Sequence, residues 1–469
     1  MNSYKKLVNN SLIFGVGTLG SKVISIILVP LYTYYLSTSE FGTVDLVTTT
    51  VNMLLPIISA SIFEAVLRFV MDKDSESDVI LSNSLFIAVY GIIIAIACYP
   101  ILSHYNVFGE NLLYFYLILI FQIFEKIFEQ YSRAIGKVKI FALNGVLLTF
   151  LIGILNVLFI VFLGMGVYGY FYSLIIANLI SINFLVFATA AYKDIQISKL
   201  SKDTTRTLLI YAAPMIPNAL MWWLINASSR YFILYFVGVS ANGLFAVASK
   251  IPSLISIINQ VFTQAWQLSA IEEYDSHNKS TFYTNVFNYF SSIMFIGTST
   301  IIVINKFLFT FFFSADYFKA WEVVPFLLIG AFFSSFSGFL GTNYVAAKQT
   351  KGVFKTSVYG GIISLILNFF FIPFFGIVGA GISSMISFFV MFLVRYFDTK
   401  KFIEMQINWS MFFFSILILL IQTIILFINL SLTTEVIIEI TLLILLVMLN
   451  RHLSALVLKI IKSLGGRIK

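Results

Sequence analysis

Apolar segments long enough to cross a bilayer recur along almost the whole chain, and they limit the possible folds more than any other feature. A spanning helix needs about 20 apolar residues. By this criterion the chain divides into about fourteen predicted spans, near residues 11–36, 43–70, 80–102, 112–133, 141–163, 167–192, 207–237, 243–269, 283–304, 323–346, 354–374, 376–397, 409–429 and 434–458. Runs such as Ile152–Leu163 do not alternate in polarity as barrel strands do. We therefore predict an all-α polytopic membrane protein.

The composition fits this fold class and excludes a soluble enzyme. Of the 469 residues, 59% are hydrophobic and 11% are charged, whereas a soluble domain has about 25% charged residues. With a cytoplasmic N-terminus, about 23 of the 29 Lys and Arg residues fall in cytoplasmic segments. Only Lys306 and Lys319 fall in segments on the external side of the membrane, and the others lie within spans. The net charge of +8 is therefore mostly a topology signal. It requires no nucleic-acid partner and predicts that both termini are cytoplasmic.

An internal repeat divides the predicted spans into two sets. Two groups of segments match at shifts of about 201 and about 211 residues: Tyr35–Gly42 with Phe236–Gly243, and Leu155-Asn156 and Gly166-x-x-Gly169 with Leu367-Asn368 and Gly376-x-x-Gly379. Because each copy has six spans, the copies insert in the same orientation, as in transporters with parallel repeats. We predict two parallel six-helix lobes, 1–205 and 206–400, and an additional transmembrane helix pair, 401–469. A central cavity between the lobes is the expected substrate site.

Several polar residues lie inside predicted spans, where a charge is costly and usually functional. Lys22, Arg230 and Lys250 lack an obvious acid one helical turn away, and we expect them to face the cavity and attract an anion. In the eighth span, one helix face is predicted to carry Lys250, Ser253, Gln260, Gln264 and Gln267. Amides suit a hydroxyl-rich ligand such as sugar, so Gln260, Gln264 and Asn226 are further candidate substrate contacts.

The intramembrane acids have two open interpretations. Glu64 and Arg68 have the i,i+4 spacing of a helical ion pair, and Glu125 and Glu129 belong to a polar stripe in the fourth span. They are either structural pairs near the cytoplasmic face or, for Glu64 or Glu125, sites for a coupling cation. The three His residues are scattered, so no metal site is predicted. Gly15-x-Gly17-x-x-Gly20 lies in a membrane helix rather than after a strand, so no cofactor is expected.

Segments spread over essentially the whole chain resemble a known family. The segments similar to Wzx-type polysaccharide flippases, in the polysaccharide biosynthesis protein family, are Ser21–Ser25, Val29–Gly42, Gly243–Ile251, Gln264–Trp266, and Leu155–Gly169 with its repeat Leu367–Gly379. This resemblance implies membership of the multidrug/oligosaccharidyl-lipid/polysaccharide exporter superfamily, with MATE-like lobes and alternating access. The implied substrate is an undecaprenyl-pyrophosphate-linked oligosaccharide that crosses the bacterial cytoplasmic membrane for capsule, exopolysaccharide or O-antigen synthesis. Lys22, Arg230 and Lys250 would then contact pyrophosphate or acidic sugar. Membrane lipids, a polymerase and export machinery are the implied partners.

Three alternatives remain open. A lipid II or teichoic-type precursor flippase shares the helix number and the cationic cavity, although the segment near 408–428 is almost wholly apolar. A cation-coupled drug antiporter of the same fold should concentrate acids rather than bases in its cavity. A membrane glycosyltransferase or polymerase is disfavoured, because the chain has neither a large external loop nor clustered acids for a metal.

Overall fold

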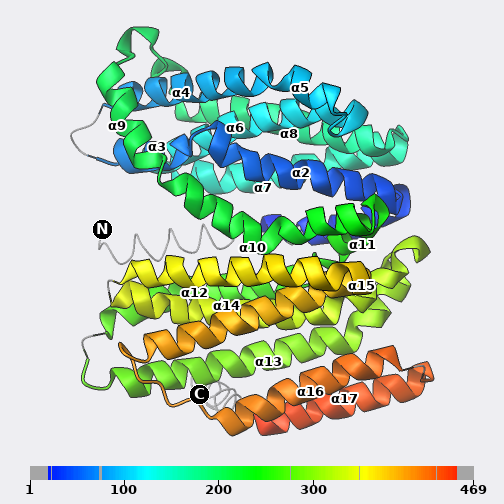
Figure 1. Ribbon diagram of the computed structural model, residues 1–469. Helices are drawn as coiled ribbons and strands as arrows, with labels where there is room; N and C mark the ends of the chain where they lie inside the picture. Colours follow the sequence, from blue (N-terminus) through cyan, green and yellow to red (C-terminus); the bar gives the residue numbers. More distant parts are fainter. Residues whose placement is uncertain are drawn as a thin grey trace, which may run out of the picture. The chain divides into compact units, whose positions relative to one another are not determined.

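The computed structural model describes residues 20–22, 24–72, 76–274, 276–347, 349–428 and 430–450. Every regular element within these ranges is helical (Figure 1), which confirms the predicted fold class. The chain forms two compact units, Met1–Ala227 (unit 1) and Ser228–Lys469 (unit 2). The lobe boundaries at residues 205 and 400 stay predictions.

Unit 1 contains helical residues 20–22 and 24–35 at its described start. Its labelled helices are α2 (Thr38–Ile58), α3 (Ile62–Val70), α4 (Ser77–Ala97), α5 (Tyr99–His104), α6 (Leu112–Ala134), α7 (Val138–Asn156), α8 (Gly166–Thr189) and α9 (Lys202–Ala212), with short helices η1 (Gly109–Asn111), η2 (Val157–Phe162), η3 (Ala191–Lys193) and η4 (Ile197–Lys199). α10 (Met215–Phe236) contains the division between the units. α9 packs against α3 and α4, and therefore belongs with unit 1.

Unit 2 continues with α11 (Val239–Ala248), α12 (Ser253–Glu272), α13 (Lys279–Phe312), η5 (Ala315–Glu322), α14 (Val324–Ala346), α15 (Thr350–Thr399), α16 (Trp409–Phe427) and α17 (Leu432–Leu449). Its interior is rich in aromatic rings. The Phe332 and Phe336 rings of α14 lie 4.3 Å apart, and Phe412 of α16 packs 5.6 Å from Phe336. These contacts join α14 to the C-terminal helix pair.

The helix lengths support a multi-pass membrane protein. Among the described residues, nine helical stretches are long and apolar enough to cross a membrane, and α11 with the first part of α12 adds a tenth as one bent span. The predicted number of fourteen spans stays a prediction. Two spans predicted at 354–374 and 376–397 are the arms of α15, which kinks at Gly376 with φ 55° and ψ −134°.

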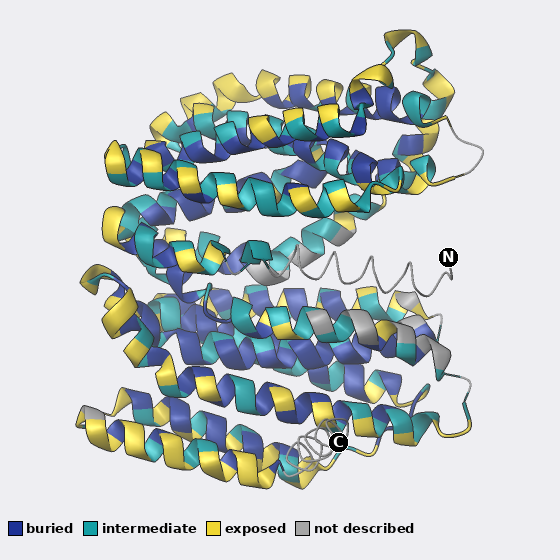
Figure 2. Ribbon diagram, turned by 180° about the vertical axis from the view of Figure 1, so that it is seen from behind, coloured by how far each residue is buried: buried dark blue, intermediate teal, exposed yellow. Residues whose placement is uncertain are grey.

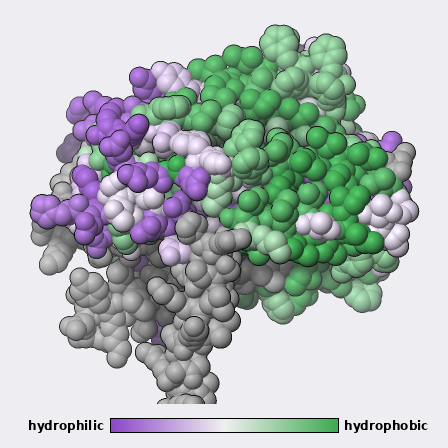
Figure 3. Space-filling model, turned by 90° about the horizontal axis from the view of Figure 1, so that it is seen from below, coloured by the Kyte–Doolittle hydropathy of each residue, from purple (hydrophilic) through white to green (hydrophobic). Residues whose placement is uncertain are grey.

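The exposed surface is suited to lipid. α16 and α17 expose Phe413, Ile424, Ile437 and Met448 by 60% or more each, and exposed residues recur along this helix pair in Figure 2. On the face seen in Figure 3, hydrophobic side chains cover most of the surface and hydrophilic ones gather at one end. Apolar side chains in contact with acyl chains cost no solvation energy, so this surface is stable in a bilayer.

Both units repeat the same contacts at the residues that carry the sequence repeat. In unit 1, Asn156 is buried and donates to the Tyr32 hydroxyl in the first helix (3.0 Å). In unit 2, Asn368 is buried and accepts a hydrogen bond from Ser229 of α10 (3.3 Å). Each Asn therefore joins the fifth helix of its copy to the first, which gives the repeat a structural basis.

The Gly-x-x-Gly pair also has the same geometry in both units. Gly166 and Gly376 have φ values of 54° and 55°, a conformation that favours glycine. Three residues later, a Cβ on Gly169 would lie 3.1 Å from the Phe159 carbonyl carbon, and a Cβ on Gly379 would overlap the carbonyl oxygen of Phe371. The motif thus supplies a sharp turn followed by close helix packing.

A tyrosine–aspartate pair is a further shared contact that sequence comparison did not detect. Tyr131 of α6 donates to Asp194, which follows η3, over 2.5 Å. Tyr344 of α14 donates to Asp398 near the end of α15 over 2.7 Å. In each unit the pair joins the fourth helix of the copy to the end of the sixth. Their sequence separations differ by several residues, which hides the match from an alignment of short motifs.

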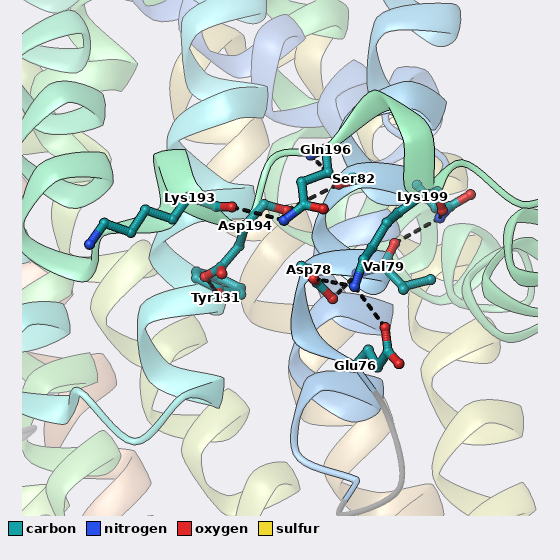
Figure 4. Close-up of polar contacts among 10 residues, drawn as sticks. Glu76, Asp78, Val79, Ser82, Tyr131, Lys193, Asp194, Gln196 and Lys199 are labelled. Atoms are coloured by element: carbon teal, nitrogen blue, oxygen red, sulfur yellow. Dashed lines mark hydrogen bonds and ion pairs between the residues drawn. The ribbon is translucent and has the colours of Figure 1, made fainter.

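The connection from α8 to α9 is fastened to the start of α4 (Figure 4). Ser82 donates to the Asp194 carbonyl and accepts from the Gln196 amide, and Lys199 of η4 pairs with Glu76 at 2.8 Å and with Asp78 at 2.6 Å. The hydrogen bonds to Asp78 and Glu76 raise the pKa of Lys199 to about 12. The ammonium group therefore stays charged at neutral pH and keeps the connection in place.

Candidate functional site

The three predicted cations, Lys22, Arg230 and Lys250, lie on different elements of the structure. Lys22 lies in the first helix of unit 1 and is half-buried. Arg230 lies on α10 in unit 2, where its guanidinium carbon is 5.6 Å from the ring centroid of Phe245. Phe245 is buried on α11, so the charged group rests on the flat face of an aromatic ring, a favourable cation–π arrangement. This contact fixes Arg230 beside the helix that leads to Lys250.

Lys250 does not lie on a continuous helix face, so that prediction is wrong. α11 ends at Ala248 and α12 begins at Ser253, and the two helices are bent by 42°. Lys250 lies in the turn between them, where the Ser253 hydroxyl donates to its carbonyl oxygen. Pro252 explains the break, because proline has no N–H and disfavours a helical conformation in the residue before it. Lys250 is therefore presented by a turn.

The predicted amide contacts are only partly described. Gln260 lies on α12 and is half-buried. Asn226 and Gln264 lie within α10 and α12, but their side chains fall outside the described residues. Gln260 and Gln264 belong to the helix that follows the turn carrying Lys250, whereas Asn226 belongs to α10, which precedes that turn.

Glu125 is the centre of a buried polar cluster in unit 1. Its side chain is only 3% exposed. The Asn144 amide of α7 donates to it over 2.8 Å, and the Ser181 hydroxyl of α8 donates to Asn144 over 2.7 Å. Lys126 lies 3.9 Å from Glu125 and 2.5 Å from Glu129. The cluster joins α6, α7 and α8, and one cation lies close to both acids.

The predicted Glu64–Arg68 pair is wrong. Arg68 instead pairs with Asp72, with 2.9 Å between Nη1 and Oδ1, and both side chains are about half exposed. α3 ends at Val70, so Asp72 lies in the following turn and reaches Arg68 with the same i,i+4 spacing. Glu64 is half-buried on α3.

Unit 2 contains a buried arginine that sequence reasoning assigned to a cytoplasmic segment. Arg395 of α15 is 3% exposed. It donates to the Ser337 carbonyl (2.7 Å), to Thr356 Oγ1 (2.9 Å) and to Ser357 Oγ (2.9 Å). Ser337 and Thr356 follow Glu125 and Asn144 by about 212 residues, which is the repeat period. The two copies thus have buried polar clusters at corresponding positions, acidic in unit 1 and basic in unit 2.

The repeat period could have predicted part of this second cluster from the sequence. Applying the period to the polar residues of the fourth and fifth spans leads from Glu125 and Asn144 to Ser337 and Thr356. Within the described residues, no group of three or more His, Cys, Asp or Glu side chains is arranged to hold a metal ion.

Known structures resemble this chain over most of its length. The lipid II flippase MurJ in an inward closed conformation is 16% identical with a TM-score of 0.68, and the match covers 94% of this chain and 98% of that chain. An inward-facing multidrug resistance MATE transporter of the MOP superfamily is 15% identical with a TM-score of 0.65, covering 81% and 95%. An outward-facing MATE transporter of the same superfamily is 16% identical with a TM-score of 0.60, covering 84% and 94%.

The family assignment comes from the sequence. Comparison with curated proteins finds no match. The model of a family described as polysaccharide biosynthesis protein matches residues 7–267, which is more than half of the 469 residues. The chain therefore belongs to the polysaccharide biosynthesis protein family and has the fold of the MATE and MurJ membrane transporters.

Proposed function

We propose that this chain is a flippase that moves an undecaprenyl-pyrophosphate-linked oligosaccharide from the inner to the outer leaflet of the bacterial cytoplasmic membrane by alternating access. The observation that carries the proposal is the family match over residues 7–267 in a chain with a transporter fold. A lipid-linked sugar is a substrate that connects a membrane transporter with polysaccharide synthesis. Both termini are cytoplasmic in this proposal, and a polymerase and export machinery take the product.

The cationic residues would recognise the pyrophosphate. Arg230 carries a planar guanidinium with five N–H donors, which matches phosphate oxygens well. Its contact with the Phe245 ring orients the group. Lys22 and Lys250 add positive charge, and Lys250 is presented by a turn that can adjust to a ligand. Gln260, Gln264 and Asn226 are the proposed contacts for the glycan.

The acids of unit 1 are proposed to be structural. Glu125 is bonded to Asn144, and Lys126 lies close to both Glu125 and Glu129. These groups satisfy one another within three packed helices. Arg68 and Asp72 form an exposed ion pair, which contributes little energy. None of these pairs is needed for the substrate contacts.

Two related functions fit the same fold less well. The MATE structures are multidrug resistance transporters, and a cavity for cationic drugs should be lined by acids, whereas the candidate residues here are Lys22, Arg230 and Lys250. MurJ is a lipid II flippase, and lipid II or a teichoic-type precursor also carries pyrophosphate. Analysis of the lipid that accumulates without the protein separates these substrates.

The direct genetic test is to delete the gene and analyse lipid-linked intermediates by leaflet. We expect the oligosaccharide intermediate to accumulate in the inner leaflet while surface polysaccharide disappears. Accumulation of lipid II would favour the precursor flippase instead. Unchanged export with no accumulated intermediate would contradict transport of any lipid-linked sugar by this chain.

Substitution of the cations tests the proposed site. A hydrogen bond to a charged group contributes about 1.5–3 kcal/mol, so Arg230→Ala and Lys250→Ala should each reduce export about tenfold to a hundredfold while the protein still accumulates in the membrane. Arg68→Ala is the matched control, because it removes an exposed cation that pairs with Asp72. Equal export by all three variants would remove Arg230 and Lys250 from the site.

A further inference from the structure

A row of polar side chains crosses the interface between α13 and the C-terminal helix pair. α16 and α17 pack against each other and against α13 in unit 2 (Figure 1). Most of this surface is apolar, yet α17 carries two acids at successive depths along its axis, Glu435 and Glu439. The two acids are one helical turn apart, about 6 Å along the axis.

The first depth is a complete ion pair. Lys306 Nζ of α13 lies 2.7 Å from Glu435 Oε2, and both side chains are mostly buried, at 23% and 12% exposure. Lys306 also lies 4.6 Å from the ring centroid of Trp321. The ammonium group therefore has both a carboxylate and an aromatic partner. The Glu435 carboxyl group in turn has a cation within hydrogen-bond distance.

The second depth contains a buried acid, Glu439, beside the amide of Gln422. Glu439 is 1% exposed, and within the described part of the chain neither of its carboxyl oxygens has a hydrogen-bond partner. Gln422 of α16 donates instead to the Glu439 backbone carbonyl over 3.4 Å, and its own carbonyl oxygen accepts from Ser299 of α13 over 2.8 Å. The polar groups beside Glu439 are therefore bonded to each other or to the backbone.

The surrounding charges do not neutralise an ionised Glu439. The charged groups that act on it are Lys306 and Glu435, and these two already pair with each other. α16 (Trp409–Phe427) contains no charged residue. An isolated carboxylate in an apolar interior is strongly unfavourable, and a second negative charge one turn away adds repulsion. The neutral, protonated carboxyl is thus the form that this site accommodates.

We propose that Glu439 is a proton-binding site, at which the buried carboxylate takes up one proton to become a carboxylic acid and releases it again. The Lys306–Glu435 pair lies one turn away and is less buried than Glu439. The proton therefore enters and leaves the site past this pair. A metal ion is a poor occupant, because it needs several oxygen ligands and the nearby Gln422 carbonyl is taken by Ser299. The site is distinct from the residues proposed to bind the substrate.

Infrared difference spectroscopy of the purified full chain tests the protonation state directly, without substrate. We expect a carboxylic-acid C=O band that is present in the wild type and lost in Glu439→Gln, a nearly isosteric change. Glu110→Gln is the matched control, because Glu110 is an exposed carboxylate that accepts from Tyr168. The band should be unchanged in that variant. Identical spectra for the wild type and Glu439→Gln would overturn the proposal.

A second measurement tests exchange. When the medium is made alkaline, Glu439→Gln should release one proton fewer per chain than the wild type or Glu110→Gln. A band that is lost in Glu439→Gln with no change in proton release would reveal a permanently protonated carboxyl, and this result would also overturn the proposal. Both readouts are independent of export, so their failure is distinguishable from failure of the flippase function.

Discussion

Arg395 shows at the residue scale how a charge is held inside this protein without an acid. Its guanidinium donates to four oxygen atoms on α14 and α15, the carbonyl oxygens of Ser337 and Val353 and the hydroxyl oxygens of Thr356 and Ser357. A guanidinium has enough N–H groups in a planar fork to reach these oxygens together, whereas a lysine ammonium is a compact point donor. The residue therefore acts as a cross-link between helices of unit 2.

Replacing Arg395 by Lys should lower the free energy of unfolding by about 1–3 kcal/mol, because buried acceptors lose their donors. The measurement is unfolding of the purified protein in detergent, followed by helix content. Arg68→Lys is the control; its exposed pair with Asp72 should make the change smaller than about 0.5 kcal/mol. An equal loss in both variants would show that the buried contacts are not what stabilises unit 2.

The residue types alone identified the polar side chains within predicted spans. They did not identify the partners of those side chains. The i,i+4 spacing applies equally to Glu64 and Asp72 around Arg68, and the structure selects Asp72. Lys250 is set apart from the helix face that begins at Ser253 by the break before Pro252. The proline was visible in the sequence, yet the helical spacing of the polar residues was given more weight.

At the scale of elements, the two Gly-x-x-Gly motifs make the turn between the fifth and sixth helices of each copy. In unit 2, Gly376 adopts φ 55° within α15, and Gly379 brings the second arm against the backbone of Phe371. The first glycine is needed for backbone conformation and the second for space. The motif therefore stabilises a tight connection between neighbouring helices.

Gly379→Ala should destabilise the protein by about 1–3 kcal/mol, because the added Cβ overlaps the Phe371 carbonyl oxygen and forces the backbone apart. Gly338→Ala on α14 is the control, since nothing lies within 4 Å of its added Cβ. That change should be neutral or stabilising by up to about 1 kcal/mol, as alanine favours helix. Thermal unfolding in detergent measures both, and a destabilised Gly338→Ala beside an unaffected Gly379→Ala would contradict this interpretation.

Helices were predictable because lipid allows few alternatives, whereas their interruptions were not. A bilayer requires long apolar helices, so the spans and their order follow from hydropathy. The break between α2 and α3 depends on Ala60 and Ser61, both with positive φ. Neither residue type signals a left-handed conformation, so the predicted span at 43–70 gave no sign of the break.

At the scale of the whole molecule, the repeat was the most informative feature of the sequence. It predicted two parallel copies, and Asn156 and Asn368 make corresponding contacts within units 1 and 2. It did not predict that the buried cluster of one copy contains Glu125 and that of the other Arg395. The charged residue can differ in sign and position between the two clusters, because each cluster only has to satisfy its own hydrogen bonds.

Reconstitution of the purified chain into vesicles is the most direct test of the central claim. A polyprenyl-pyrophosphate-linked oligosaccharide would be placed in one leaflet, and its arrival in the opposite leaflet would be followed with a membrane-impermeant sugar-modifying enzyme. We predict transfer that is faster with the wild-type chain than in protein-free vesicles and that falls about tenfold or more with Arg230→Ala. Equal transfer with and without the wild-type chain would contradict the account.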